Sequence, residues 1–105
     1  MSNPNISMTQ VVVVEEEVRF TLGELCRASH ARIEQLVALV ELGALTPSGE
    51  GQQGWRFEGS SLKRARVATR LTRDLELSAA GAALVLDLLD EIESLRSQLR
   101  RVGNY

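Results

Sequence analysis

Apolar side chains recur at helical spacing in four stretches of the chain, and each stretch follows a serine or threonine that could cap a helix. Glycine-rich and polar segments separate these stretches, and a valine-rich segment precedes them. The pattern therefore predicts a mainly α fold with a small β component. The expected helices cover about 22–28, 31–42, 62–74 and 79–101.

The first two expected helices form a helix-turn-helix unit, with a turn of about three residues between them. Thr21 and Glu24 have the spacing of a capping box, in which each side chain accepts a hydrogen bond from the other residue's backbone amide. Ser29 is expected to cap the second helix, and Gly43 is expected to end it in the left-handed conformation. The second helix is expected to face the core with Ile33, Leu36, Val37 and Val40.

Two short strands joined by a polar loop are expected after this unit. Residues 45–47 and 55–57 carry the apolar side chains of the strands, whereas residues 48–54 contain three glycines and no apolar side chain. This arrangement predicts a β-hairpin wing. We expect Trp55 and Phe57 of the second strand to pack the wing against the core. A further short strand is expected within 10–20, where Val11–Val14 has high β-propensity, and it could join the wing.

The third expected helix has two contrasting faces, and Ser60 or Ser61 is placed to cap it. Its inner stripe consists of Leu62, Ala65, Ala68, Leu71 and Leu75. Its outer stripe is basic and consists of Lys63, Arg66, Arg70 and Arg73. We expect this basic stripe to be a solvated helix face, with contact to an acidic partner or residual phosphate binding as the alternatives.

The last helix, which Ser78 is expected to cap, carries a heptad pattern. Its apolar side chains are spaced by four, three, four and three residues, which is the spacing of a coiled-coil seam. A helix of about 22 residues is about 33 Å long, so a domain of this size cannot cover all of it. We therefore expect a homodimer; packing of the stripe on its own domain is the alternative. The seam residues are Leu88, Ile92, Leu95, Leu99 and Val102.

Charge argues against a nucleic-acid reader. The 105 residues have a net charge of −2, whereas proteins that bind nucleic acid usually have a basic excess. Residues 1–58, which hold the helix-turn-helix pattern, contain eight acidic and four basic residues. Val11–Val14 is too short for a signal peptide and is followed by Glu15–Glu17, so a cytoplasmic protein without a membrane segment is expected.

No catalytic, metal or cofactor site is evident in the sequence. His30 is the sole histidine and lies in the turn between the first two helices, without a second histidine or a cysteine at metal-ligand spacing. The glycines of 49–54 are not followed by the Gly-Lys-Ser/Thr of a phosphate-binding loop. Cys26 is expected to be a buried small apolar residue. We therefore expect a protein that is not an enzyme.

Four motifs carry a family resemblance, and they are Phe20–Cys26, Leu42–Pro47, Trp55–Phe57 and Asp74–Ser78. In this order and spacing they resemble the MerR-type winged helix-turn-helix. The small size, the β-prone N-terminal stretch and the leucine-rich last helix without an effector domain are similar to the chaperone-modulator CbpM family. The resemblance implies three parts: a flexible tail at 1–17 with a short strand, a winged helix-turn-helix at 18–77, and a dimerisation helix at 78–105.

The same resemblance implies a function. Proteins of the CbpM family bind the J-domain of a DnaJ-like, curved-DNA-binding co-chaperone and inhibit it. The alternatives are a small MerR-type transcriptional regulator and an excisionase-like DNA-binding protein. A structural or dimerisation module with another partner is a third reading.

The second helix lacks the residues of a DNA reader. MerR-type readers carry Ile-Arg-Tyr-Tyr-Glu before the Leu-Gly exit, and the Arg-Tyr-Tyr positions here are Val37, Ala38 and Leu39. These side chains cannot read bases or bind phosphates. The acidic outward line that results suits a basic protein helix, such as the one a J-domain carries, although a merely solvated face is the alternative. The expected partner-binding residues are Glu24, Glu34, Gln35, Ala38 and Glu41.

Overall fold

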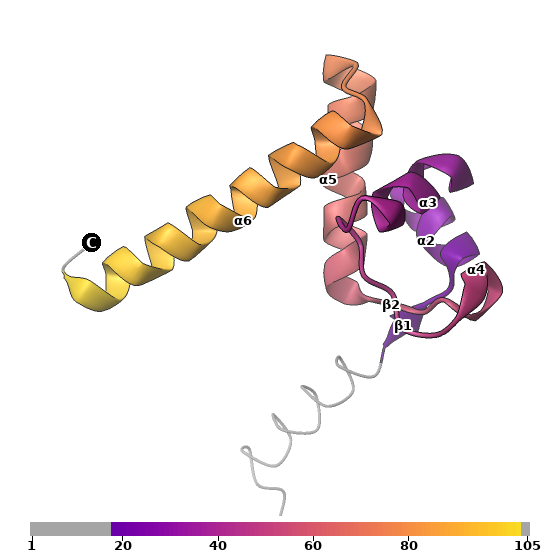
Figure 1. Ribbon diagram of the computed structural model, residues 1–105, viewed down its shortest axis with the longest axis horizontal. Helices are drawn as coiled ribbons and strands as arrows, with labels where there is room; N and C mark the ends of the chain where they lie inside the picture. Colours follow the sequence, from indigo (N-terminus) through magenta and orange to yellow (C-terminus); the bar gives the residue numbers. More distant parts are fainter. Residues whose placement is uncertain (1–17, 104–105) are drawn as a thin grey trace, which may run out of the picture.

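The computed structural model describes residues 18–103, which form a small body and a long projecting helix (Figure 1). A two-stranded antiparallel sheet lies at one edge of the body and contacts α2 and α5. The expectation for residues 10–17 lies outside the described residues. The elements are β1 (Arg19–Phe20), α2 (Leu22–Ser29), α3 (Ile33–Glu41), α4 (Gly51–Gly54), β2 (Phe57–Glu58), α5 (Gly59–Leu75) and α6 (Ala79–Val102).

Helices α2 and α3 form the predicted helix-turn-helix. The capping box is confirmed, because the Thr21 hydroxyl accepts from the Glu24 amide and the Glu24 carboxylate accepts from the Thr21 amide. The predicted cap at Ser29 is wrong. Its hydroxyl is buried and donates to the Leu25 carbonyl oxygen, so it ends α2 instead of starting α3. Arg32 occupies the N-cap position of α3.

The core-facing side of α3 differs from the expectation. Leu36 and Leu39 are buried, Val37 and Val40 are half-buried, and Ile33 is 48% exposed. The helix begins at Ile33, so this side chain lies in the first turn, where the core does not reach it. The predicted inward placement of Ile33 is therefore wrong, and Leu39, for which the sequence analysis gave no placement, lies in the core.

The wing is built differently from a simple hairpin. The two sides of the wing meet at one β-bridge between Ser48 and Arg56. The glycine-rich segment between these two residues forms the helical turn α4. Strand β2 pairs with β1, with Phe20 opposite Phe57. The prediction that an N-terminal strand joins the wing is thus confirmed within Arg19–Phe20, whereas the predicted first strand at 45–47 is reduced to the adjacent bridge.

Helix α5 connects the wing to the last helix. It begins at Gly59 after Glu58, so the predicted serine cap is wrong, and Ser61 is instead buried inside the first turn. Ala65 and Ala68 of the expected inner stripe are buried. Leu75, expected in the same stripe, is exposed because it is the last residue of the helix.

The aromatic residues of the wing pack as predicted. Phe57 is fully buried in the core, and Trp55 packs against it edge to face with ring centroids 6.1 Å apart. This contact fixes the wing to the body because the two rings cover apolar surface that the small sheet cannot cover alone.

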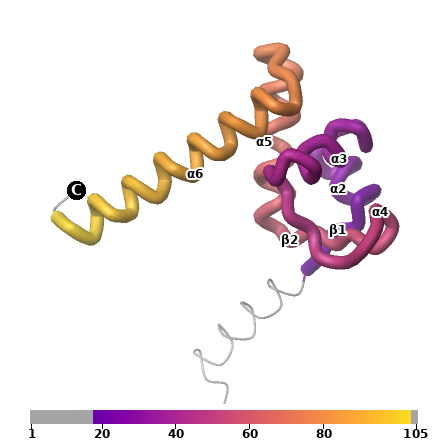
Figure 2. The backbone as a smooth tube through the Cα atoms, in the orientation of Figure 1, coloured from indigo at the N-terminus to yellow at the C-terminus, as the bar shows by residue number. Residues whose placement is uncertain are grey.

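Helix α6 belongs to the body only at its start. Ser78 caps it as predicted, by accepting from the Gly81 amide. Its buried residues are Ala82, Ala83 and Leu86, all in the first two turns or so. The rest of the helix projects away from the body as an arm (Figure 2).

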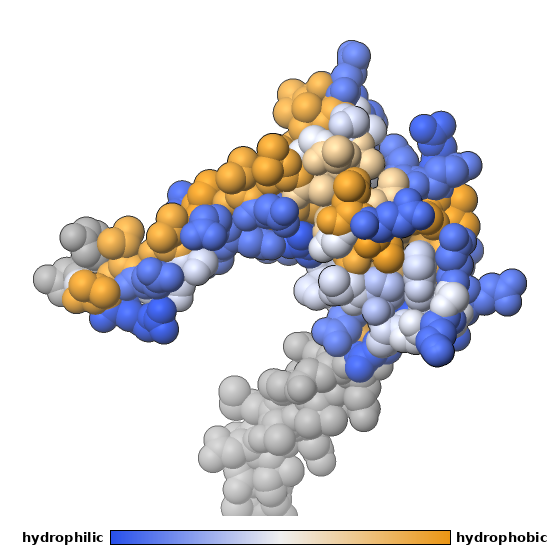
Figure 3. All heavy atoms as spheres, viewed as in Figure 1, coloured by the Kyte–Doolittle hydropathy of each residue, from blue (hydrophilic) through white to orange (hydrophobic). Residues whose placement is uncertain are grey.

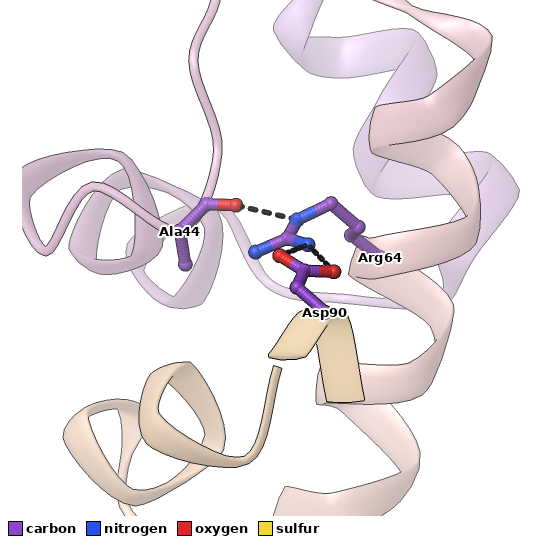
Figure 4. Close-up of polar contacts among 3 residues, drawn as sticks. All are labelled: Ala44, Arg64 and Asp90. Atoms are coloured by element: carbon purple, nitrogen blue, oxygen red, sulfur yellow. Dashed lines mark hydrogen bonds and ion pairs between the residues drawn. The ribbon is translucent and has the colours of Figure 1, made fainter. Parts of the chain in front are cut away.

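One arginine ties the arm to the body. The Arg64 guanidinium donates to the Ala44 carbonyl oxygen at 2.8 Å and to both carboxylate oxygens of Asp90 at 2.8 and 2.9 Å (Figure 4). Ala44 lies just after α3, whereas Asp90 lies on α6. A single side chain of α5 thus braces the angle between the helix-turn-helix and the arm.

Candidate protein-interaction site

The outward line of α3 carries two carboxylates and no cation. Glu34 and Glu41 are exposed, and Ala38 lies half-buried between them. Within residues 18–103, neither carboxylate has an ion-pair partner. The three positions are four and three residues apart, so they share one helix face. This surface is available to a partner.

Gln35 belongs to a different side of α3. Its side-chain oxygen accepts from the Arg32 amide at 3.0 Å and completes the cap of the helix. It also lines a hollow between α3 and the start of α6, beside Leu77 and Ala79. Of the five predicted partner-binding residues, Gln35 therefore lies beside the acidic line and already has a structural role.

Glu24 lies on α2, where it also has a capping role. Its carboxylate accepts from the Thr21 amide at 2.9 Å, and this hydrogen bond lowers the pKa of Glu24 below its usual value. The nearby cations Arg27 and Arg56 act in the same direction. Glu24 is exposed and ionised at neutral pH, so it adds negative charge to this side of the body while capping α2.

Two exposed apolar residues extend the surface of α3 in a way that the sequence pattern did not predict. Ile33 lies at the start of the helix and is 48% exposed, and Leu42 caps its end and is 50% exposed. Ile33 also lines a hollow with Gly23 of α2 and Gln52 of the wing. The face therefore combines acidic and apolar groups. The exposure of Ile33 could have been predicted only if the start of α3 had been placed at residue 33.

Cys26 supports the core near this surface. It packs against the hydrophobic core, and its burial raises the pKa of the thiol. Cys26 is half-buried and not fully buried as predicted, and a thiol with a raised pKa is a weak nucleophile. In the described part of the chain, no group of three or more histidine, cysteine, aspartate or glutamate residues could hold a metal ion.

Sequence comparison places this geometry in a family. A family model described as MerR HTH family regulatory protein matches residues 20–104. The chain belongs to this MerR helix-turn-helix family. It is also 36% identical over 94 residues to the chaperone modulatory protein CbpM of Coxiella burnetii (strain Dugway 5J108-111), with 90% of this chain and 89% of that protein covered.

A second relative has the same name. The chaperone modulatory protein CbpM of Pseudomonas putida (strain W619) is 34% identical over 102 residues, with 93% of this chain and 97% of that protein covered. The similarity thus includes the MerR frame and the last helix, and the two chains have nearly the same extent. Both names describe regulators, which are not enzymatic kinds of protein.

A stripe of cations lies on α5, whereas α3 (Ile33–Glu41) contains none. The four residues of the basic stripe, Lys63, Arg66, Arg70 and Arg73, are exposed. Arg66 donates a long hydrogen bond to the Ala28 carbonyl oxygen at the end of α2, and Arg73 lies 3.4 Å from Asp74. These contacts fit a solvated face that also stabilises the packing of α5 on α2. None of the stripe lies on the helix that reads bases in MerR-type DNA binders.

The arm of this MerR-family chain presents the predicted seam to solvent. The exposed fractions of the five seam residues range from 46% to 83%. In Figure 3, hydrophobic residues follow one edge of the arm and hydrophilic residues follow the other. No helix in residues 18–103 is long and apolar enough to span a membrane. The seam residues are Leu88, Ile92, Leu95, Leu99 and Val102.

Proposed function

We propose that this protein modulates a chaperone system, and that it does so in the cytoplasm by binding and inhibiting the J-domain of a DnaJ-like, curved-DNA-binding co-chaperone. The chaperone-modulating role is supported by the two relatives, which match nearly the whole chain and whose names state that role. The J-domain as the target follows from the family resemblance.

The observation that carries this proposal is the surface of α3. The helix lacks the hydrogen-bond donors of a DNA reader, Glu34 and Glu41 are exposed on its outward line, and Ile33 adds an exposed apolar group beside them. Phosphates would be repelled by this face, whereas a basic amphipathic helix could place its cations against the carboxylates and its apolar side on Ile33. Such charge complementarity chiefly raises the association rate and the specificity.

Inhibition follows from occupancy alone. A J-domain uses its basic helix to engage its Hsp70 partner, as the resemblance implies, so a protein that covers this helix blocks the encounter. No bond needs to be made or broken by the modulator. Its affinity then sets the fraction of co-chaperone that remains active.

A charge-neutralising pair tests the acidic face. The variant Glu34→Gln with Glu41→Gln should weaken binding of a J-domain from the same organism by about three- to ten-fold, because each exposed ion pair contributes about 0.2–1 kcal/mol. The matched control, Asp74→Asn with Glu76→Gln at the exposed end of α5, removes the same charge elsewhere and should leave the affinity within about two-fold. Calorimetric titration at low salt measures both.

Two results would contradict this placement. One is an equal loss of affinity in both charge-neutralised variants, which would mean that only net charge matters. The other is the absence of binding by the unaltered protein at about 100 µM, a concentration that a useful regulator should not need.

Ile33 provides an independent test of the same face. Because it is half-exposed, Ile33→Ala should change the free energy of unfolding by less than about 0.5 kcal/mol. The loss of buried apolar area in the complex should nevertheless weaken J-domain binding by about five-fold. Leu75→Ala, at another exposed position, serves as the control and should bind normally. If the two variants bind equally well, Ile33 is not in the interface.

The alternative, a small DNA-binding regulator, is favoured only by the MerR frame and the basic stripe of α5. It predicts a gel shift with a DNA duplex at low salt that disappears steeply as salt is raised. The proposed function predicts that the J-domain binds more tightly than the duplex under the same conditions.

A further inference from the structure

A hollow of about 220 Å³ lies where α3, the second half of α5 and the start of α6 meet (Figure 1). Gln35 borders both this hollow and the acidic line of α3, but Glu34 and Glu41 do not line the hollow. Pockets that hold small ligands are concave and mostly apolar, with a few polar groups that fix the orientation of the ligand. The residues that line the hollow therefore decide whether it can bind such a ligand.

The floor of the hollow is apolar and belongs to the core. Leu36 and Leu39 line it from α3 and Ala68 lines it from α5, and all three are almost fully buried. Leu77, in the turn before α6, adds a half-buried apolar side chain. Burial of apolar surface from water is favourable. The floor therefore favours a ligand with an apolar part.

The polar lining of the hollow offers hydrogen-bond donors and a positive charge. Arg32 is the one charged side chain among the lining residues, and its guanidinium forms no ion pair within residues 18–103. The side-chain oxygen of Gln35 already accepts from the Arg32 amide, so the NH2 group is the part that Gln35 can offer to a ligand. A carboxylate supplies the acceptor oxygens and the negative charge that match these groups.

The volume of the hollow limits its occupant to a small molecule. A cavity of about 150 Å³ in a protein core holds a benzene molecule, so the larger volume here admits an apolar group of about six to eight carbons. A helix of another protein is about 10 Å across and is too wide to enter. The side chain of an aspartate or a glutamate has too little apolar surface to cover Leu36 and Leu39.

We propose that this hollow binds a small carboxylate that carries an apolar group of about six to eight carbons. The apolar group lies on Leu36, Leu39 and Ala68, and the carboxylate accepts hydrogen bonds from the side chains of Arg32 and Gln35. This site uses neither the acidic line of α3 nor the arm, so it does not depend on the proposed function.

Three probes separate the two halves of the site. Octanoate should bind the unaltered protein with a dissociation constant of about 0.1–1 mM, which is usual for a ligand of this size. Octanol lacks the charge and acetate lacks the apolar chain, so each should bind about ten-fold more weakly or less. Calorimetric titration measures all three. Equal affinities for octanoate and octanol, or for octanoate and acetate, would overturn the proposal.

Amide chemical shifts locate the bound ligand. In the isotope-labelled full chain, octanoate should shift the amide signals of Leu39, Thr72 and Ala79, which lie on the three helices around the hollow. A surfactant-like association with the exposed leucines of the arm would instead shift signals between Leu88 and Leu99. Shifts confined to the arm would overturn the proposal.

Removal of one cation tests the charged half of the site. Arg32→Gln should weaken octanoate binding by about three- to ten-fold and leave octanol binding unchanged, because only the carboxylate contacts the guanidinium. The matched control, Arg70→Gln, removes an exposed cation that does not line the hollow and should bind octanoate within about two-fold of the unaltered protein. An equal loss in both variants would show that only net charge matters.

A larger side chain tests the apolar half. Thr72 is half-buried and lines the hollow, whereas Thr46 is exposed and lies outside it. Thr72→Phe should occupy the hollow and weaken octanoate binding by about ten-fold or more, and Thr46→Phe should bind normally. Circular dichroism establishes that both variants fold; if Thr72→Phe does not, the Arg32→Gln comparison and the chemical shifts decide. Full octanoate affinity in a folded Thr72→Phe variant would refute the site.

Discussion

Arg64 connects three parts of the molecule through one guanidinium. It is the most buried member of the ion pairs in residues 18–103, with its side chain 24% exposed, and it satisfies a carbonyl and a carboxylate at once. Charge-assisted hydrogen bonds of this kind contribute more than neutral ones. Its position explains why an arm with so few body contacts has a defined direction.

Arg64→Gln should therefore lower the free energy of unfolding by about 1–3 kcal/mol, as expected for lost hydrogen bonds to charged groups. The control Arg70→Gln removes an exposed cation of the same helix and should change it by less than about 0.5 kcal/mol. Urea denaturation followed by circular dichroism measures both. Equal midpoints for the two variants would contradict the bracing role.

The capping box at the start of α2 predicts a pH-dependent stability. The pKa of Glu24 is lowered in the folded state, so its contribution is complete above the ordinary glutamate pKa and is lost as the pH falls through the lowered value. Glu24→Gln should thus lower the urea midpoint at about pH 7, and the difference from the unaltered protein should shrink near about pH 3. A difference that does not depend on pH would show that the carboxylate charge is irrelevant.

At the scale of the elements, the sequence predicted the four long helices because their apolar periodicity and the caps Thr21 and Ser78 agree. The sequence-based prediction was wrong where a serine was expected to cap the start of a helix. Ser29 donates to a carbonyl within its own helix, and Ser61 is buried in a helix that already began at Gly59. A hydroxyl can serve either end of a helix, so sequence alone does not tell which one it serves.

The wing was also predicted only in outline. Its aromatic anchors were recognised, but residues 48–54 lack apolar groups and gave no signal for α4. Backbone conformation decides this turn instead. Gly49 adopts φ +91°, and a Cβ at this position would lie 2.1 Å from the Gly54 carbonyl oxygen.

Gly49→Ala should consequently destabilise the protein by about 1–3 kcal/mol through backbone strain and this clash. Gly59→Ala is the matched control, because Gly59 lies in α5 with open space around its Cα, and there the same change should stabilise by about 0.5–1 kcal/mol. Thermal melts distinguish the two signs. If Gly49→Ala melted at or above the unaltered temperature, the closed turn around α4 would be incorrect.

At the scale of the whole molecule, one MerR frame exposes two separate surfaces, which are the outward face of α3 and the apolar edge of the arm. The outward face of α3 has an acidic line that the sequence predicted, and the apolar residues Ile33 and Leu42 that it did not. The arm exposes the five apolar residues that the sequence predicted for a dimer seam, and their pairing stays a prediction. What the sequence could not predict is where tertiary packing stops, and Ile33 is exposed instead of buried for that reason.

The separation of these surfaces allows their roles to be tested separately. Substitutions on α3 should affect J-domain binding without affecting assembly, and substitutions on the arm should affect assembly first. The brace at Arg64 lies between the two and relates their orientations.

The most direct test of the central claim measures the ATPase activity of an Hsp70 that is stimulated by the J-domain protein from the same organism. Addition of this chain should return the rate to its unstimulated level as the J-domain becomes saturated, with no effect on the basal rate of the Hsp70 alone. A stimulated rate that stays unchanged at saturating concentrations of the chain would contradict the account.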